Sequence, residues 1–499
     1  MTRWLIALAA LAVVFAWPMQ VTGYNQNAHY ALVRALAVHG TPSIDESRGE
    51  IGELSTGDAA RFDGHWYAAK APGLAFLSLP AFEVVEAIGM RTTGEPTRVL
   101  WWLHLWAVAL PALLVVVLVR WVGDQLEPGF GAPAAITAGL ATLLLPFATL
   151  YFAHVAAAAF SFAAFALLLR ERLGLPSSRL VFAGGLLAGL AVVVDYPLAL
   201  TAAVLGLYVL VRGPRLVRAG AYAAGGLVGV LPLLLFNWWA FGSPTHIAYE
   251  DYYAGGEKAG GLFGFGLPSV SHARELLFST MGLLVLTPVV LAAAVGLVLL
   301  FRRRRAEALV LGGVVLAYFL WNTSLRYASP FGGLGPPRYL LPLIPFLAVG
   351  LSVAYRRFPI TTLALAAVSA FQMVVTTATG PLAAYDGSWM TRLRAREFVA
   401  TAAAFVDVTG WYTILVFFVC AAVAAVIGAS FVRFGSRDAF DLPLAFASTA
   451  VWVLLAVNAN NPNGRTLEAR YAIAVAAIAA VSAAVTLLAS RQFDRQLGI

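Results

Sequence analysis

The stretch "STGDAARFDGHWYAAKAPG", residues 55–73, brings together side chains that can act as acids, bases and phosphate ligands. Asp58 and Asp63 could accept a proton from a hydroxyl group, and His65 adds an imidazole that could bind substrate. Lys70 is one of only two lysines among 33 lysines and arginines. A lysine ammonium is a compact point charge that can stabilise a departing phosphate, although it could also simply extend to a membrane interface.

Other candidates lie far from this stretch. His154, in "LYFAHVAAA", is flanked by apolar residues, and it could transfer protons or simply bond a carbonyl at a helix end. Asp195, in "VVVDYPL", is a similar candidate that could equally cap the turn before a proline. Aromatic and charged residues for sugar stacking or pyrophosphate binding, or for an ordinary aromatic belt, occur in "HIAYEDYY" and "RYASPFGGLGPPRY": Glu250, Arg326, Arg338 and Tyr339.

The composition is that of a membrane protein. Of the 499 residues, 61% are hydrophobic and 12% are charged, and the mean hydropathy is +0.81. Apolar stretches long enough for a helix to cross a bilayer recur along the chain, which predicts an all-α polytopic membrane protein. Cys420 is the only cysteine, so neither a disulfide framework nor a thiolate metal site is expected.

The arginines predict the topology. They gather in short turns between apolar stretches, and placing these turns inside gives about fourteen membrane spans with both termini in the cytoplasm. The net charge of +8 therefore reflects membrane orientation, and no nucleic-acid partner is expected. The spans are expected at residues 4–21, 98–121, 131–152, 155–170, 179–194, 197–212, 216–236, 282–301, 307–322, 338–355, 359–378, 412–432, 442–458 and 471–490. The first is interpreted as a retained span, because no cleavage pattern follows it.

This topology requires residues 71–90 to lie in the membrane interface, with a short span as the alternative. Pro80 interrupts that stretch, and Glu83 and Glu86 share one helical face. Both lysines and all seven histidines then fall in outer loops or near outer helix ends, so an active site is expected on the extracytoplasmic side of the cell membrane. The largest outer loops are residues 22–97 and 237–281.

The loop 22–97 begins with a predicted amphipathic helix on the outer membrane surface. The helix is expected to run from Asn25 to about Val38 and to end at Gly40. Asn25 and His29 are four residues apart and share a flank, whereas Arg34 is expected on the polar side. An acidic segment that includes Asp45 follows.

The order of these elements resembles the GT-C glycosyltransferases. It is most similar to the branch that contains the aminoarabinose and protein O-mannosyl transferases, in which a first span, a surface helix, an acidic loop and a second surface helix precede many spans. "GHWYAAKAPG" is similar to a G-x-x-Y-x-x-K-P-P-like stretch of that branch's lipid A enzymes, at Gly64, Tyr67, Lys70 and Pro72. By this resemblance, residues 1–215 form the conserved core and residues 216–499 a variable transmembrane module.

The resemblance implies an enzyme that transfers a sugar from a polyprenyl-phosphate donor to a hydroxyl of a cell-envelope glycan or lipid, with inversion. Membrane lipids, this donor and the acceptor are the expected partners. Some enzymes of this family use a divalent cation, but the sequence offers no clear ligand set. The residues expected to bind substrate are Asn25, Asn27, His29, His65, Tyr67, Lys70, Glu250, Arg326, Arg338 and Tyr339.

The sequence departs from the family at the position of the usual acid after the first span. It reads Tyr24-Asn25-Gln26-Asn27, and an amide cannot act as a general base. A second family acid corresponds to His154. The base is therefore expected among Asp58, Asp63 and His154, with Asp45 as a further candidate. The alternative functions are a non-catalytic binder or translocator of polyprenyl-linked glycans, and a structural subunit of an envelope-assembly complex.

Overall fold

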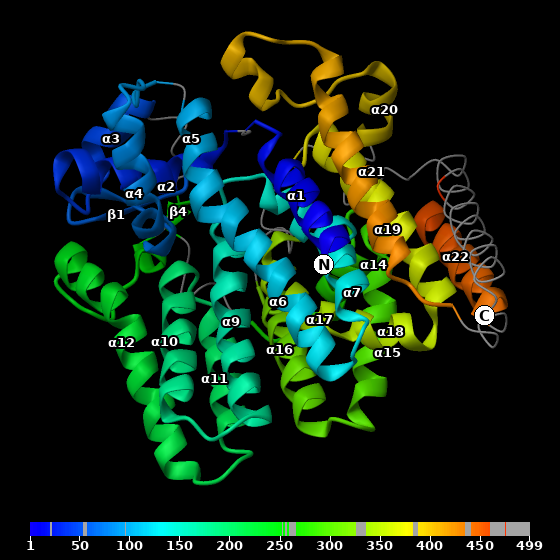
Figure 1. The fold of residues 1–499 in the computed structure, drawn as a ribbon. Coiled ribbons are helices and arrows are strands. Elements are labelled where there is room, and N and C mark those ends of the chain that lie inside the picture. The colour runs from blue at the N-terminus through cyan, green and yellow to red at the C-terminus, as the bar shows by residue number, and fades with distance from the viewer. Residues whose placement is uncertain are drawn as a thin grey trace.

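The computed structural model describes residues 1–19, 22–52, 57–94, 96–251, 253–254, 257–258, 266–325, 336–382, 388–434, 441–459 and 475. Helices dominate the fold, and two short antiparallel hairpins accompany them (Figure 1). One hairpin joins β1 (Ala59–Phe62) to β2 (His65–Ala68), and the other joins β3 (Tyr253–Ala254) to β4 (Glu257–Lys258).

Within the described residues, six helices are long and apolar enough to cross a membrane. Each of two further bent helix pairs could form one more span. The six are Thr97–Leu126 (α5, Thr97–His104; a π-helix, Leu105–Ala109; α6, Leu110–Leu126), α9 (Ala153–Leu173), α12 (Arg215–Phe241), α16 (Arg305–Thr323), α19 (Pro359–Thr379) and Trp411–Ser430, which contains α21 (Leu415–Ser430). The bent pairs are α13 (Val270–Phe278) and α14 (Leu283–Leu286) with α15 (Val289–Phe301), and η6 (Arg338–Leu343) and α17 (Ile344–Ala348) with α18 (Gly350–Arg357).

Shorter apolar helices complete the bundle. They are α1 (Thr2–Ala16), α7 (Gly131–Leu140), α10 (Ser178–Val194), α11 (Leu198–Val209) and α22 (Leu442–Asn458). The all-α multi-pass class is thus confirmed, whereas the count of fourteen spans stays a prediction. The first thirteen predicted spans each fall on one of these helices or pairs, and the last lies, apart from residue 475, outside the described residues.

A cap of short elements follows α1, at the upper left of Figure 1. It contains α2 (Tyr24–Arg34), which continues as a π-helix (Ala35–His39), then α3 (Asp45–Ile51), the hairpin β1–β2 and α4 (Gly73–Ala87). The predicted helix ends at Gly40 as expected, where the backbone adopts a left-handed φ of 63°. The small helices α8 (Leu144–Ala148), α20 (Ser388–Ala395), η4 (Ala248–Asp251), η7 (Ala402–Val406) and η8 (Trp411–Ile414) connect larger ones.

The expectation of an exposed polar flank on α2 is wrong. Every residue from Asn25 to Arg34 is buried, because α3, α4 and the hairpin enclose the helix. The Arg34 guanidinium donates to Glu50 Oε2 at 2.6 Å and to the Thr92 carbonyl at 2.9 Å, so its charge is compensated inside the protein.

Helix α4 agrees with the prediction that residues 71–90 do not cross the bilayer. Its 15 residues are fewer than the ~20 that a span requires. Pro80 lies inside it, Glu83 and Glu86 are exposed, and Phe82 and Val85 on the other face are buried. This pattern is that of a helix lying on one face against the protein.

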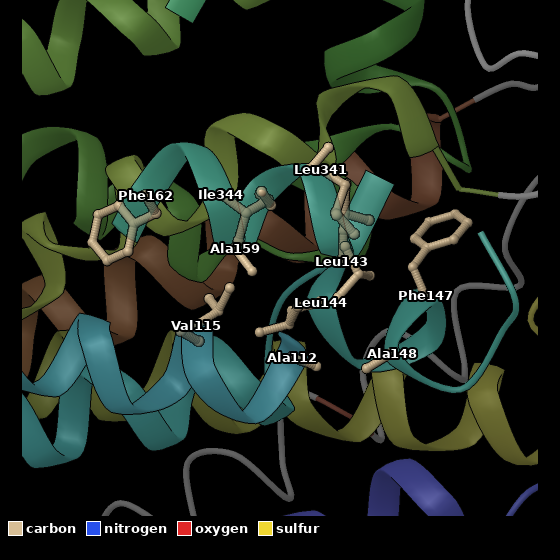
Figure 2. Close-up of a cluster of buried hydrophobic side chains, with 14 of the residues drawn as sticks. Ala112, Val115, Leu143, Leu144, Phe147, Ala148, Ala159, Phe162, Leu341 and Ile344 are labelled. Atoms are coloured by element: carbon tan, nitrogen blue, oxygen red, sulfur yellow. The ribbon is translucent and has the colours of Figure 1, made fainter. Parts of the chain in front are cut away.

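The core is formed where α6, α8, α9, η6 and α17 meet (Figure 2). Small and large side chains alternate across this junction, so that neighbouring backbones approach closely. The labelled members are Ala112, Val115, Leu143, Leu144, Phe147, Ala148, Ala159, Phe162, Leu341 and Ile344, all of them buried.

Helices α10 and α12 pack through glycines. Gly185 and Gly189 of α10 face Gly225 and Gly229 of α12, each pair being four residues apart. A Cβ at any of these positions would meet the facing backbone. This is the small-xxx-small packing of membrane helices. Because α12 packs on α10, this contact crosses the boundary between residues 1–215 and 216–499, a division that stays a prediction.

We predict that Gly225→Ala destabilises the fold by about 1–3 kcal/mol, because the added methyl overlaps the Phe182 carbonyl oxygen. Gly226→Ala is the matched control, since the nearest atom to its Cβ is the Gly185 oxygen at 3.8 Å. Thermal unfolding in detergent should show a lower midpoint for Gly225→Ala alone. Equal midpoints for the two variants would contradict this packing.

Candidate active site

A pocket of about 650 Å³ lies at one end of α9, beneath the cap. The start of α2, the segment after β2, the turn between α10 and α11, η4, and residues near α16 and η6 form its walls. Its polar and ionisable lining residues are Asn25, His29, Lys70, His154, Asp195, Tyr249, Trp321 and Tyr339. Residues separated by more than 300 positions in the sequence thus face one space.

Lys70 is the cation of this pocket. Its Nζ lies 3.2 Å from Asp58 Oδ2 and donates a hydrogen bond to the Tyr249 hydroxyl at 3.2 Å. Asn25 Nδ2 donates to the same Asp58 oxygen at 3.3 Å. The side chains of Lys70 and Asp58 are only 12% and 13% exposed, so the pair is largely shielded from water. Burial raises the pKa of the Tyr249 phenol, which therefore stays neutral beside the ammonium.

His154 and Asp195 form a second pair in the pocket. His154 is the second residue of α9, and Asp195 directly follows the last residue of α10. His154 Nδ1 lies 2.7 Å from Asp195 Oδ2. A carboxylate is an acceptor only, so a neutral ring in this pair carries its proton on Nδ1 and keeps a lone pair on Nε2. This arrangement can accept a proton from a bound hydroxyl group.

Aromatic rings fix the imidazole of His154. The Tyr339 ring meets it edge-on with centroids 5.5 Å apart, and the Phe152 ring is stacked at 6.2 Å. Trp321 packs on Tyr339 at 5.9 Å. The Arg338 guanidinium carbon lies 5.3 Å from the centroid of the Tyr339 ring and 5.2 Å from that of the Phe152 ring. The rings restrict His154 and offer flat surfaces on which a sugar could stack.

His29 is held neutral in the pocket wall. Burial, followed by the charge of Lys70, lowers the pKa of His29 to about 3. Its Nδ1 and the Asn25 Oδ1 are buried without a hydrogen-bond partner among the described residues. Both residues line the pocket, so these atoms can bond a polar ligand there.

The structure thus brings five of the predicted site residues into one pocket: Asn25, His29, Lys70, His154 and Tyr339. Asp58 contacts this group through Lys70, and Arg338 through Tyr339. Asn27 is buried in α2 but does not line the pocket, and Arg326 lies outside the described residues.

Other predicted residues lie away from the pocket. Asp63 is exposed in the turn of the hairpin, where its φ is 47°. His65 is 63% exposed and bonds Asp45, while Tyr67 packs its ring on Phe241 at 4.9 Å. Glu250 lies 3.7 Å from His246 Nδ1 and is 40% exposed. None of these side chains lines the pocket.

Asp45 anchors the hairpin. Its carboxylate accepts hydrogen bonds from the Trp66 backbone amide at 2.8 Å and from the Ser43 hydroxyl at 2.6 Å, and its Oδ2 lies 2.7 Å from His65 Nδ1. Burial alone would raise the pKa of Asp45, but these hydrogen bonds outweigh it and hold the pKa below its usual range. These three partners belong to the cap, and Asp45 does not line the pocket.

The sequence did not identify Tyr249 or Trp321 as pocket residues, nor the pairing of Asp195 with His154. Tyr249 stands in the aromatic segment "HIAYEDYY", but nothing there separates it from its neighbouring tyrosines. Asp195 was noted as an acid at the end of an apolar stretch, yet its partner is 41 residues away. Among the described residues, no group of three or more His, Cys, Asp or Glu side chains is placed to hold a metal ion.

The fold is shared with ArnT from Cupriavidus metallidurans. The apo structure of that protein has a TM-score of 0.51 at 16% identity, over 86% of this chain and 78% of ArnT. The ArnT structure bound to undecaprenyl phosphate has a TM-score of 0.51 at 18% identity, over 91% of this chain and 79% of ArnT. At these identities the likeness is one of fold, and it confirms the predicted GT-C architecture.

A weaker likeness, with a TM-score of 0.42 at 12% identity, is to the Archaeoglobus fulgidus oligosaccharyltransferase in the apo form, over 93% of this chain and 58% of that one. No protein-family model matches the sequence, and no curated protein matches it significantly.

We predict that His29 makes the fold less stable as the pH falls. Below its ordinary pKa of about 6.5 the unfolded chain takes up a proton at His29, whereas the folded chain does so only near a pKa of about 3. The free energy of unfolding should therefore fall by about 2 kcal/mol between pH 7 and pH 5 through this residue alone.

The measurement is the unfolding midpoint of the wild type and of His29→Gln across this pH range. The wild-type midpoint should fall more steeply with decreasing pH, because glutamine does not titrate. Parallel curves for the two proteins would contradict a neutral, buried His29.

Proposed function

We propose that this protein transfers a sugar from a polyprenyl-phosphate donor to a hydroxyl group of a cell-envelope glycan or lipid, with inversion at the anomeric carbon. The proposal rests on one observation. A cation, Lys70, and a proton acceptor, the His154–Asp195 pair, line the same pocket of a GT-C fold. ArnT, which shares the fold, binds undecaprenyl phosphate. In this account the pocket faces the extracytoplasmic side and both termini are cytoplasmic.

Lys70 is the proposed ligand of the donor phosphate. A phosphate that separates from a sugar gains negative charge on the departing oxygen, and a fixed ammonium in a shielded pocket stabilises that charge strongly. Asp58 and Tyr249 hold Nζ in place before the donor arrives. Asp58 is therefore better suited to positioning Lys70 than to accepting a proton, because protonation would remove the counter-charge of the ammonium.

His154 is the proposed general base. Its Nε2 would take the proton of the acceptor hydroxyl while the oxygen attacks the anomeric carbon and the bond from that carbon to the phosphate oxygen breaks. The electron pair of the broken bond remains on the phosphate beside Lys70. Asp195 would stabilise the imidazolium that forms, and it would keep the ring in the tautomer that has its lone pair on Nε2.

His29 and Asn25 are proposed to bind sugar hydroxyls. The unpartnered His29 Nδ1 and Asn25 Oδ1 supply polar contacts, and the neutral state of His29 lets it bond a hydroxyl without adding a second positive charge. Trp321 and Tyr339 offer the stacking faces. Which sugar is transferred would depend on these groups.

An apolar groove is the proposed place of the polyprenyl chain. It lies between α1, α4 and the helix Thr97–Leu126, and its lining includes Pro80, Val84 and Trp106. The first residue of α4, Gly73, packs against the backbone of Val193 and Val194 beside the pocket. Helix α4 therefore leads from the pocket to the groove, which suits a lipid whose phosphate lies at Lys70.

We predict that Lys70→Ala lowers kcat/KM by ~10²–10³ and His154→Ala by ~10²–10⁴ in transfer from a panel of polyprenyl-phosphate sugars. The first loses charge stabilisation of the phosphate, and the second loses the base. Glu83→Gln, on the exposed face of α4, is the control and should transfer at the wild-type rate.

Two results would contradict this assignment. Binding of donors without turnover for every acceptor would support the alternative of a non-catalytic binder or translocator, which the amide at the family's acid position favours. Loss of transfer in Asp63→Asn, together with full activity of His154→Ala, would place the base at the hairpin turn.

We predict that Asp195→Asn lowers kcat by ~10²–10⁴ while the affinity for the donor stays within about threefold, as when the orienting acid of a catalytic histidine is replaced by an amide. Asparagine can donate to Nδ1 and so favours the tautomer whose lone pair is on the wrong nitrogen. The comparison of kcat with donor affinity separates this role from a structural one, because a disturbed pocket would weaken both. An unchanged kcat would show that Asp195 only caps α10.

A further inference from the structure

A second polar hollow lies at the other end of α9. It has a volume of about 1090 Å³, and its walls come from the end of α9, the turn between α11 and α12, and the turn between α15 and α16. Six arginines line it: Arg172, Arg212, Arg302, Arg303, Arg304 and Arg305. We refer to it as the arginine hollow.

Two of the six arginines are fixed in the wall. Arg172 Nε donates to Glu307 Oε1 at 2.6 Å, and among the residues that the structure describes Glu307 is the only acidic one that lines the hollow. Arg212 Nη1 donates to the carbonyl oxygens of Glu171 at 2.7 Å and of Arg172 at 3.1 Å. The position of these two guanidinium groups is therefore set by the protein, as in a prepared anion site.

Three of the other four arginines carry charge that no described acidic residue neutralises. All four are exposed, and within the described part of the chain Arg302, Arg304 and Arg305 form no ion pair. Arg303 lies 3.7 Å from Glu127 and is 64% exposed. Several like charges around one hollow repel one another, so a bound anion would relieve this repulsion.

The hollow lies at the ends of apolar helices, where a bilayer has its headgroups. Arg305 is the first residue of the spanning helix α16, and Phe301 is the last residue of α15. Helix α9 has 21 residues and so a length of about 30 Å, the thickness of a hydrocarbon core, which places this hollow and the active-site pocket at opposite membrane faces. Exposed apolar side chains adjoin it: Leu173 is part of its lining, and the Phe301 ring lies 5.7 Å from the Arg305 guanidinium.

We propose that the arginine hollow binds the phosphate headgroup of an anionic phospholipid in the leaflet opposite the active site. The guanidinium groups pair with phosphate oxygens, for which their fork geometry is suited, and the neighbouring apolar side chains contact the acyl chains. The apolar contacts favour a lipid over a soluble phosphate. This site does not depend on the proposed transfer reaction.

The test measures lipid binding to the purified full-length chain by native mass spectrometry. Phosphatidylglycerol is compared with phosphatidylcholine of the same acyl chains, and inorganic phosphate is added in a separate arm as a competitor. The hollow variant carries Arg302→Gln, Arg304→Gln and Arg305→Gln. The control variant carries Arg179→Gln, Arg215→Gln and Arg357→Gln, three exposed arginines that do not line the hollow, so it has the same net charge.

The wild type should prefer phosphatidylglycerol, and the hollow variant should bind it ~100-fold more weakly, at about fivefold for each guanidinium that no longer pairs with the headgroup phosphate. The control should change less than about threefold, and inorganic phosphate should not displace the lipid. Equal losses in the two variants, no preference over phosphatidylcholine, or displacement by inorganic phosphate would overturn the proposal.

If the glutamine variant does not remain monodisperse, a variant with lysine at the same three positions replaces it. This variant should bind phosphatidylglycerol several-fold more weakly than the wild type, because lysine lacks the bidentate fork of arginine. Unchanged binding would overturn the proposal.

Discussion

The candidate active-site pocket depends on one ion pair, Lys70 with Asp58, at the end of an apolar helix bundle. A lysine that is only 12% exposed needs a fixed counter-charge, and removal of one partner from a buried pair typically costs about 3–5 kcal/mol. Asn25 bonds Asp58 and Tyr249 bonds Lys70, so the pair ties α2 and η4 to the segment around the hairpin. Three segments far apart in the sequence are thus brought to one place by a single buried charge.

The same constraint separates the proposed roles of the acidic residues. Asp58 balances the charge of Lys70, so proton transfer falls to another pair, in which Asp195 orients His154. Asp45 is engaged with the hairpin backbone instead. Each carboxylate has a defined partner, as burial requires of ionised groups. The environment therefore distinguishes side chains that are chemically alike in the sequence.

Much of the fold could be predicted because the bilayer restricts spanning elements to apolar helices. Local residues predicted two further features: Gly40 predicted the end of the cap helix, and Pro80 with the two glutamates predicted that α4 does not cross the bilayer. Lys70 and His154 were predicted as site residues from their unusual type and setting, and both line the pocket. His65 and Tyr67 were predicted from their nearness to Lys70, but the hairpin directs them elsewhere. Long-range pairs such as His154 with Asp195 depend on helix packing, which residue types alone do not encode.

The central claim is that the pocket beside Lys70 receives the phosphate of a polyprenyl lipid. The most direct measurement is an experimental structure of the protein with a polyprenyl phosphate bound in a lipid nanodisc. The account predicts phosphate oxygens within hydrogen-bond distance of Lys70 Nζ, with His154 lining the space next to them. A lipid phosphate bound on the far side of the bundle, away from Lys70, would contradict it.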